Sequence, residues 1–176
     1  VDPFRFSIGS VEKYKAYACG GNFYQIKKPI THHFKSLANA LESPSCEILY
    51  DFSKFEHPMV IHRAMVALSK FQQRTGRLPL PRNEEDANTL ISIARESNAE
   101  LSALDIDVLK GLSYTARGQL NPMAAFVGGI VAQEAQKSTT GKFTPIPQWF
   151  HFESLLSLPK EAPSEEDCQP TGTRYD

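Results

Sequence analysis

Residues 58–76, PMVIHRAMVALSKFQQRTG, decide the fold of this chain. Apolar side chains recur there at the spacing of a helix with one buried face. Pro58 suits the first turn of such a helix, and Gly76 suits its end. The buried face is predicted to hold Ile61, Ala64, Met65, Leu68 and Phe71.

Three further helices are predicted after this one. Asn83 can cap a helix whose first turn, residues 84–86, is acidic and so favours the positive end of the helix dipole. Asp105 is predicted to cap a helix ending near Gly118, and another runs over residues 121–140. Four helices joined by short links predict an antiparallel bundle, because each apolar face must be covered by another.

Short strands are predicted before the bundle, at residues 4–8, 22–27 and 48–52, with a short helix at 34–41. So few strands leave unpaired edges, so we expect their partners to lie outside this chain. The chain starts with Val1 rather than methionine, and we expect its natural beginning to lie upstream.

The last predicted helix is apolar nearly all round between Met123 and Ala132, so we expect it to pack on more than one side. Gly128–Gly129 within it costs roughly 1 kcal/mol of helix propensity per glycine, which indicates a close approach of other backbone. A strand rich in aromatic residues at 148–152 follows, and linker composition begins at Ser157.

The sequence thus predicts an α+β chain that is mainly helical. Short strands come first, a four-helix bundle lies in the middle, and a helix and a strand follow. We divide it into residues 1–55, 56–120, 121–156 and 157–176.

Composition excludes several classes of partner. The 19 basic and 20 acidic residues nearly cancel, so neither nucleic acid nor an anionic membrane is expected to bind. The longest apolar run, Met123 to Val127, is far shorter than the roughly 20 residues of a membrane span. Cys19, Cys46 and Cys168 lie far apart without paired spacing, as reduced thiols of the cytosol or nucleus do.

No catalytic, cofactor-binding or metal-binding residue is predicted. Cys19 lies beside glycines and could expose a thiolate, but only Lys15 is near enough in sequence to activate it, so an ordinary loop thiol is favoured. The adjacent rings of His32–His33 point in opposite directions. His57 and His62 have no cysteine or carboxylate at ligand spacing, so zinc is not predicted there.

Charged groups are interpreted as structural. Glu134 and Lys137 lie three residues apart on a helix, where a solvated ion pair is more common than an acid and base pair. Arg74, Arg77 and Arg82 are expected to pair with local acidic residues. Gly128–Gly129 lies inside a helix, so it cannot cradle a phosphate.

Residues 121–134, NPMAAFVGGIVAQE, resemble the ubiquitin-activating enzyme family, as do GKFTPI at 141–146 and QWF at 148–150. The resemblance continues along the whole chain. Its other motifs are FSIG at 6–9, GG at 20–21, FKSL at 34–37, DFSKF at 51–55, PRNEEDA at 81–87 and RYD at 174–176.

The resemblance implies an architecture. Residues 1–55 would be the closing part of the first catalytic-cysteine half-domain and a connector, and residues 56–120 the helical bundle. Residues 121–156 would return to the inactive adenylation domain, which is Rossmann-like, and residues 157–176 would be a linker.

The resemblance also implies a function. The family adenylates ubiquitin with ATP and magnesium, forms a thioester on a cysteine, and passes ubiquitin to conjugating enzymes in the cytoplasm and nucleus. Its nucleotide motif, magnesium ligands and catalytic cysteine would follow Asp176, so no site residue is carried onto this chain, and Cys19, Cys46 and Cys168 match none of those roles. Alone, the chain is expected to be inactive. Implied partners are ubiquitin or a ubiquitin-like modifier, the active adenylation domain of the same chain and conjugating enzymes.

Departures from the family pattern leave alternatives open. Cys19 stands where the family usually has a basic residue, and Ala135–Gln136 and Ser138–Thr139 replace more apolar pairs. An activator of a ubiquitin-like modifier is therefore one alternative. A free-standing helical interaction module and a small hydrolase using Cys19 are the others.

Overall fold

The computed structural model describes residues 9–10, 12–22, 24, 26, 28–47, 54–154, 157, 160–169 and 171–173. The chain divides into two compact units, Val1–His33 and Phe34–Asp176. The described residues of the first unit form neither helix nor strand. The strand predicted at 4–8 lies outside the described residues, as do three positions of the one at 22–27, whose described positions are not in a strand.

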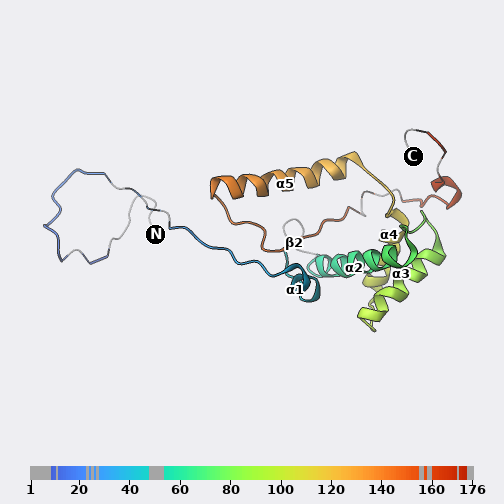
Figure 1. Cartoon of the computed structure of the whole chain (residues 1–176). Coiled ribbons are helices and arrows are strands. Elements are labelled where there is room, and N and C mark those ends of the chain that lie inside the picture. Colours follow the sequence, from blue (N-terminus) through green and yellow to red (C-terminus); the bar gives the residue numbers. More distant parts are fainter. Residues whose placement is uncertain are drawn as a thin grey trace. The chain divides into compact units, whose positions relative to one another are not determined.

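The second unit is mainly helical, as predicted. The strand predicted at 48–52 lies outside the described residues, but two short strands flank the helices and pair in parallel. In chain order (Figure 1), the elements are α1 (Leu37–Glu42), β1 (Cys46–Glu47), α2 (His57–Thr75), α3 (Glu84–Ser97), α4 (Ala103–Thr115), α5 (Asn121–Thr140), β2 (Trp149–Phe150) and the 3-10 helix η2 (Glu166–Cys168).

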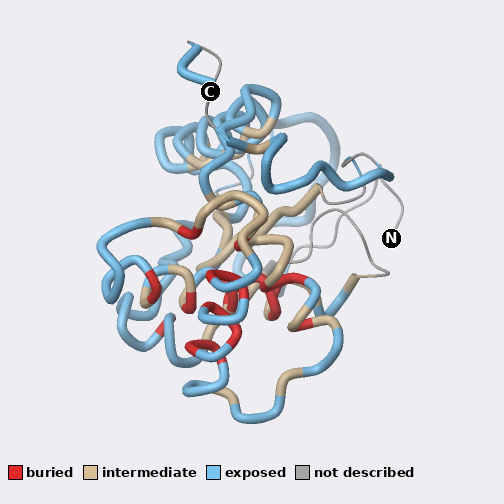
Figure 2. The backbone as a smooth tube through the Cα atoms, turned by 90° about the vertical axis from the view of Figure 1, so that its right-hand side faces the viewer, coloured by how far each residue is buried: buried red, intermediate tan, exposed pale blue. Residues whose placement is uncertain are grey.

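The hydrophobic core lies among α2, α3 and α4, which pack pairwise on one another. Figure 2 shows the buried residues gathered in one region of the backbone. Phe71 from α2 and Leu90 from α3 are fully buried there. The predicted face of α2 is confirmed at Ile61, Ala64 and Phe71, whereas Met65 at its edge is 46% exposed.

Local signals fix most of the helix ends. Asn83 caps α3 as predicted, accepting a hydrogen bond from the backbone nitrogen of Asp86 at 2.9 Å. Gly76 ends α2 and Gly141 ends α5, each with a positive φ that glycine adopts without strain. The predicted cap Asp105 is wrong by three residues. Ser102 is the cap, and Asp105 closes a capping box from within the first turn.

Substituting Ser102 by alanine should lower the free energy of unfolding by about 1 kcal/mol, because the first turn of α4 loses the acceptor for the Asp105 amide. Chemical denaturation followed by circular dichroism measures the change. Ser92→Ala is the matched control, since Ser92 is exposed within α3 and caps nothing. Equal stabilities for the two variants would contradict a capping role for Ser102.

Helix α5 differs from its prediction. We expect from the sequence that it packs on more than one side, yet none of its twenty residues, all described, is buried. Val131 is 61% exposed, and Phe126 and Val127 are exposed as well. The core that positions the other helices is therefore made by three of the four predicted bundle helices. No helix among the described residues has the length and apolarity to cross a membrane.

Candidate functional site

Three potential ligand side chains meet where β1, α2 and the segment after β2 come together. Cys46 lies in β1, His62 in α2, and His151 follows β2. The cysteine sulfur and one ring nitrogen from each histidine all lie within 4.8 Å of one another. His62 is only 3% exposed, and the other two side chains are half-buried.

Strand pairing brings this cluster together. Cys46 stands opposite Trp149 in the parallel β1–β2 ladder. Alternation along an extended chain places His151, two residues on, on the same side as Trp149. Their rings stack, with centroids 5.9 Å apart and planes 11° apart. The indole nitrogen of Trp149 donates to the carbonyl of Ala40 at 3.1 Å, which ties the strand to α1.

A contact with a backbone carbonyl indicates the tautomer of His62. Its Nε2 lies 3.4 Å from the carbonyl oxygen of Leu41, and a carbonyl can only accept, so Nε2 carries the proton. In the neutral ring Nδ1 then carries the lone pair, and this atom faces Nε2 of His151 at 3.2 Å. The thiol of Cys46 points to the carbonyl of Pro58 at 3.9 Å.

Burial shifts the pKa values of His151 and Cys46 toward their neutral forms. Burial, helped by the nearby His62, lowers the pKa of His151 to about 4. Burial also raises the pKa of the Cys46 thiol. The three side chains offer two imidazole nitrogens and one sulfur, a donor set that suits a transition metal.

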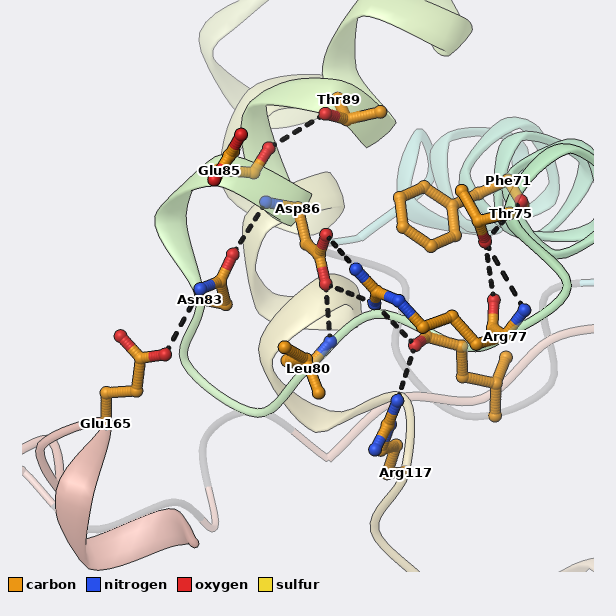
Figure 3. A network of polar contacts seen from close by, with 11 residues as sticks. Phe71, Thr75, Arg77, Leu80, Asn83, Glu85, Asp86, Thr89, Arg117 and Glu165 are labelled. Carbon is orange, nitrogen blue, oxygen red and sulfur yellow. Dashed lines mark hydrogen bonds and ion pairs between the residues drawn. The ribbon is translucent and has the colours of Figure 1, made fainter.

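A second polar network lies where α2 leads into α3 (Figure 3). Asp86 accepts from two guanidinium nitrogens of Arg77, at 2.6 and 2.9 Å, and from the backbone nitrogen of Leu80 at 2.7 Å. The carbonyl of Leu78 accepts from Arg77 and Arg117. The bonds of Asp86 join the α2–α3 loop to α3, and the Arg117 bond joins that loop to the segment after α4, so the network is structural.

The other charged groups also have structural partners, and for Arg82 the partner is an aromatic ring rather than the acidic residue expected. Arg74 makes a two-pronged bond with Glu96 at 2.6 Å, and the guanidinium of Arg82 lies 5.2 Å from the ring centroid of Tyr114. Glu134 and Lys137 form the predicted ion pair at 2.5 Å. Glu134 also accepts from the backbone nitrogen of Ile146 at 3.0 Å, which fixes the chain after α5.

The remaining candidates are scattered. Cys19 is exposed in the first unit, and Cys168 is half-buried in η2. His32 and His33 are exposed. His57 lies 3.7 Å from a carboxylate oxygen of Glu153.

Sequence reasoning missed the cluster because its members come from three distant segments. His62 and His151 are separated by 89 positions, so no ligand spacing appears in the sequence. The one usable signal was the strand at 148–152, which carries His151, but its partner strand could be identified only from the fold.

Comparison with protein families places the chain among known sequences. The family model described as "Ubiquitin-activating enzyme E1 four-helix bundle" matches residues 28–98. The mainly helical structure is consistent with such a bundle.

Individual proteins are similar over a longer range. The rabbit ubiquitin-like modifier-activating enzyme 1 is 41% identical over 99% of this chain. Ubiquitin-activating enzyme E1 2 of Arabidopsis thaliana is 42% identical over 100% of it, and ubiquitin-activating enzyme E1 1 of Schizosaccharomyces pombe is 44% identical over 99%. The chain spans 17% of the length of the rabbit and Arabidopsis proteins and 18% of the fission-yeast protein.

Proposed function

Because this chain is homologous, along its whole length, to a segment of the ubiquitin-activating enzymes, we propose that it is a non-catalytic scaffold within such an enzyme. The observation that carries the proposal is the 41% identity over 99% of the chain to a protein of which it spans only 17%. Under this proposal the complete protein adenylates ubiquitin with ATP and magnesium and transfers it as a thioester to conjugating enzymes. The chain itself supplies no catalytic residue, and it works in the cytoplasm and nucleus.

The contrast between the helical core and the two short strands supports a scaffold role. The α2–α4 core buries its own apolar faces and the Asp86 side of its ion pair with Arg77. Strands β1 and β2, by contrast, pair in parallel over two residues each. Parallel strands are normally buried inside larger sheets with helices on both faces. This supports a return of residues 121–156 into a Rossmann-like inactive adenylation domain.

Helix α5 supports the same arrangement. Phe126 contacts Phe150 and Phe152 at centroid distances of 6.3 and 4.1 Å, so one side of the helix lies on the β2 segment. Val127 and Val131 remain exposed. Within a complete enzyme we place the active adenylation domain of the same chain over them, because exposed apolar patches mark interaction surfaces.

Putting this chain in place of the matching segment of the fission-yeast enzyme, the parent enzyme, tests the proposal. The segments are 44% identical, and a scaffold should keep its function at that similarity. We expect ATP-dependent thioester formation with ubiquitin within about tenfold of the parent enzyme, which corresponds to about 1.4 kcal/mol. Non-reducing gels of the charged enzyme measure it.

A matched control tests whether thioester formation needs this segment to be folded. The same chimera with Phe71→Asp should lose thioester formation, because a charge buried in the bundle core unfolds the scaffold. A chimera that is monomeric and unfolds cooperatively yet forms no thioester would contradict the proposal. Charging by a ubiquitin-like modifier but not by ubiquitin would favour the alternative, an activator of that modifier.

A further inference from the structure

We propose that Cys46, His62 and His151 form a binding site for Zn²⁺ that joins β1, α2 and the β2 segment. The ligands would be one thiolate sulfur and two imidazole nitrogens, a set typical of zinc. The inference rests on the geometry of the cluster and stands apart from the proposed function.

The spacing of the donor atoms fits one ion. Zinc binds imidazole nitrogen at about 2.0–2.1 Å and thiolate sulfur at about 2.3 Å, so two tetrahedral ligand atoms lie roughly 3.3–3.6 Å apart. Nδ1 of His62 and Nε2 of His151 are 3.2 Å apart. All three donor atoms lie within 4.8 Å of one another, so closing the site takes side-chain shifts of about 1 Å, without a change of fold.

The surrounding groups already orient the ligands. A histidine that binds a metal usually donates its other ring N–H to a carbonyl or carboxylate. Nε2 of His62 has this partner in the carbonyl of Leu41. His151 is held against Trp149, whose indole is fixed by the carbonyl of Ala40. Helix α1 thus supplies the carbonyl that orients His62 and the carbonyl that fixes Trp149 beside His151.

Binding of the metal ion releases one proton. The metal forms one bond to sulfur and two to nitrogen, and the thiol proton of Cys46 passes to solvent. The proton on Nε2 of His151 moves to Nδ1 of the same ring, so that neutral imidazole loses none. A water would complete the four ligands, and a cleft of about 600 Å³ reaches His62, the one member of the cluster that borders it.

Cobalt titration of the purified 176-residue chain, stripped of metal with a chelator, tests the site. Co²⁺ replaces zinc and reports a thiolate ligand by a charge-transfer band in the near ultraviolet. We expect this band to saturate at one ion per chain and zinc to abolish it by displacement. His151→Ala should weaken Co²⁺ binding by at least about tenfold. That is the lower limit of the effect of removing a residue that only hydrogen-bonds to a metal ligand.

Thiol controls identify the sulfur. Cys46→Ser should remove the charge-transfer band, whereas Cys168→Ser, at another half-buried thiol, should leave it unchanged. If Cys46→Ser fails to fold, X-ray absorption of the wild-type chain with zinc decides, and it should show one sulfur and two imidazole nitrogens. Zinc that dialyses away, a shell without sulfur, or a band that survives Cys46→Ser would overturn the proposal.

Discussion

Truncating Phe71 to alanine should lower the free energy of unfolding of the chain by about 3–5 kcal/mol, the range for a buried phenylalanine. Phe71 is 0% exposed and lies in the core shared by α2, α3 and α4. Its loss removes apolar burial and leaves a cavity that three packed helices cannot easily close. A domain is stable by about 5–15 kcal/mol, so much of that margin would be lost. Urea denaturation followed by circular dichroism measures it.

Met65→Ala is the matched control for Phe71→Ala. Both residues lie in α2 and both were predicted on its buried face, but Met65 is 46% exposed. Its truncation should cost less than about 1 kcal/mol, since it removes little buried area. Similar losses for the two variants would mean that α2 packs on α3 and α4 through a different face.

The helices could be predicted because their signals are local. The apolar period of residues 58–76, the cap at Asn83 and the terminal glycine at 76 all act within a few residues, and the structure has them as predicted. The error at Asp105 has a local cause too. Ser102 and Asp105 both carry capping side chains, and in a capping box each bonds the backbone of the other.

Packing could not be predicted in the same way. Apolar residues all round α5 indicate burial, but they do not say whether this chain or another polypeptide provides it. Within the part of the chain that the structure describes, the helix buries no residue. The cluster of Cys46, His62 and His151 shows the same limit, because a two-residue parallel pairing brings its segments together.

The fold is also compatible with the alternative function, a free-standing helical interaction module. The α2–α4 core is closed by its own contacts, so a segment such as residues 56–141 could fold alone. Cooperative unfolding of that segment, with binding of a protein partner and without the strands, would favour the module. The zinc site bears on the same question, since it would fasten β1 and the β2 segment to α2 and make them part of one unit.

Replacing Asp86 with alanine should lower the free energy of unfolding by about 2–4 kcal/mol. Asp86 is 7% exposed and accepts three hydrogen bonds, two from Arg77 and one from the backbone of Leu80 (Figure 3). Removing a buried partner leaves the others unsatisfied, which costs more than the bonds themselves contribute. The loss stays below the full range for a buried ion pair, because the side chain of Arg77 is 43% exposed and can reach water.

Glu85→Ala is the control, because Glu85 is exposed in the same first turn of α3 and should change the stability by less than about 0.5 kcal/mol.

Acid provides a second test of the ion pair. The bonds from Arg77 hold the pKa of Asp86 below its ordinary value of 3.8. A carboxyl group with a lowered pKa in the folded state stabilises the fold above the unfolded pKa and loses that effect as the pH falls through the folded one. The difference in unfolding free energy between the wild type and Asp86→Asn should therefore be full at neutral pH and should shrink once the pH falls below 3.8. A difference that stays constant down to pH values below the folded pKa would mean that the Asp86 carboxylate contributes no charge-dependent stability, and that its side chain acts only through its shape.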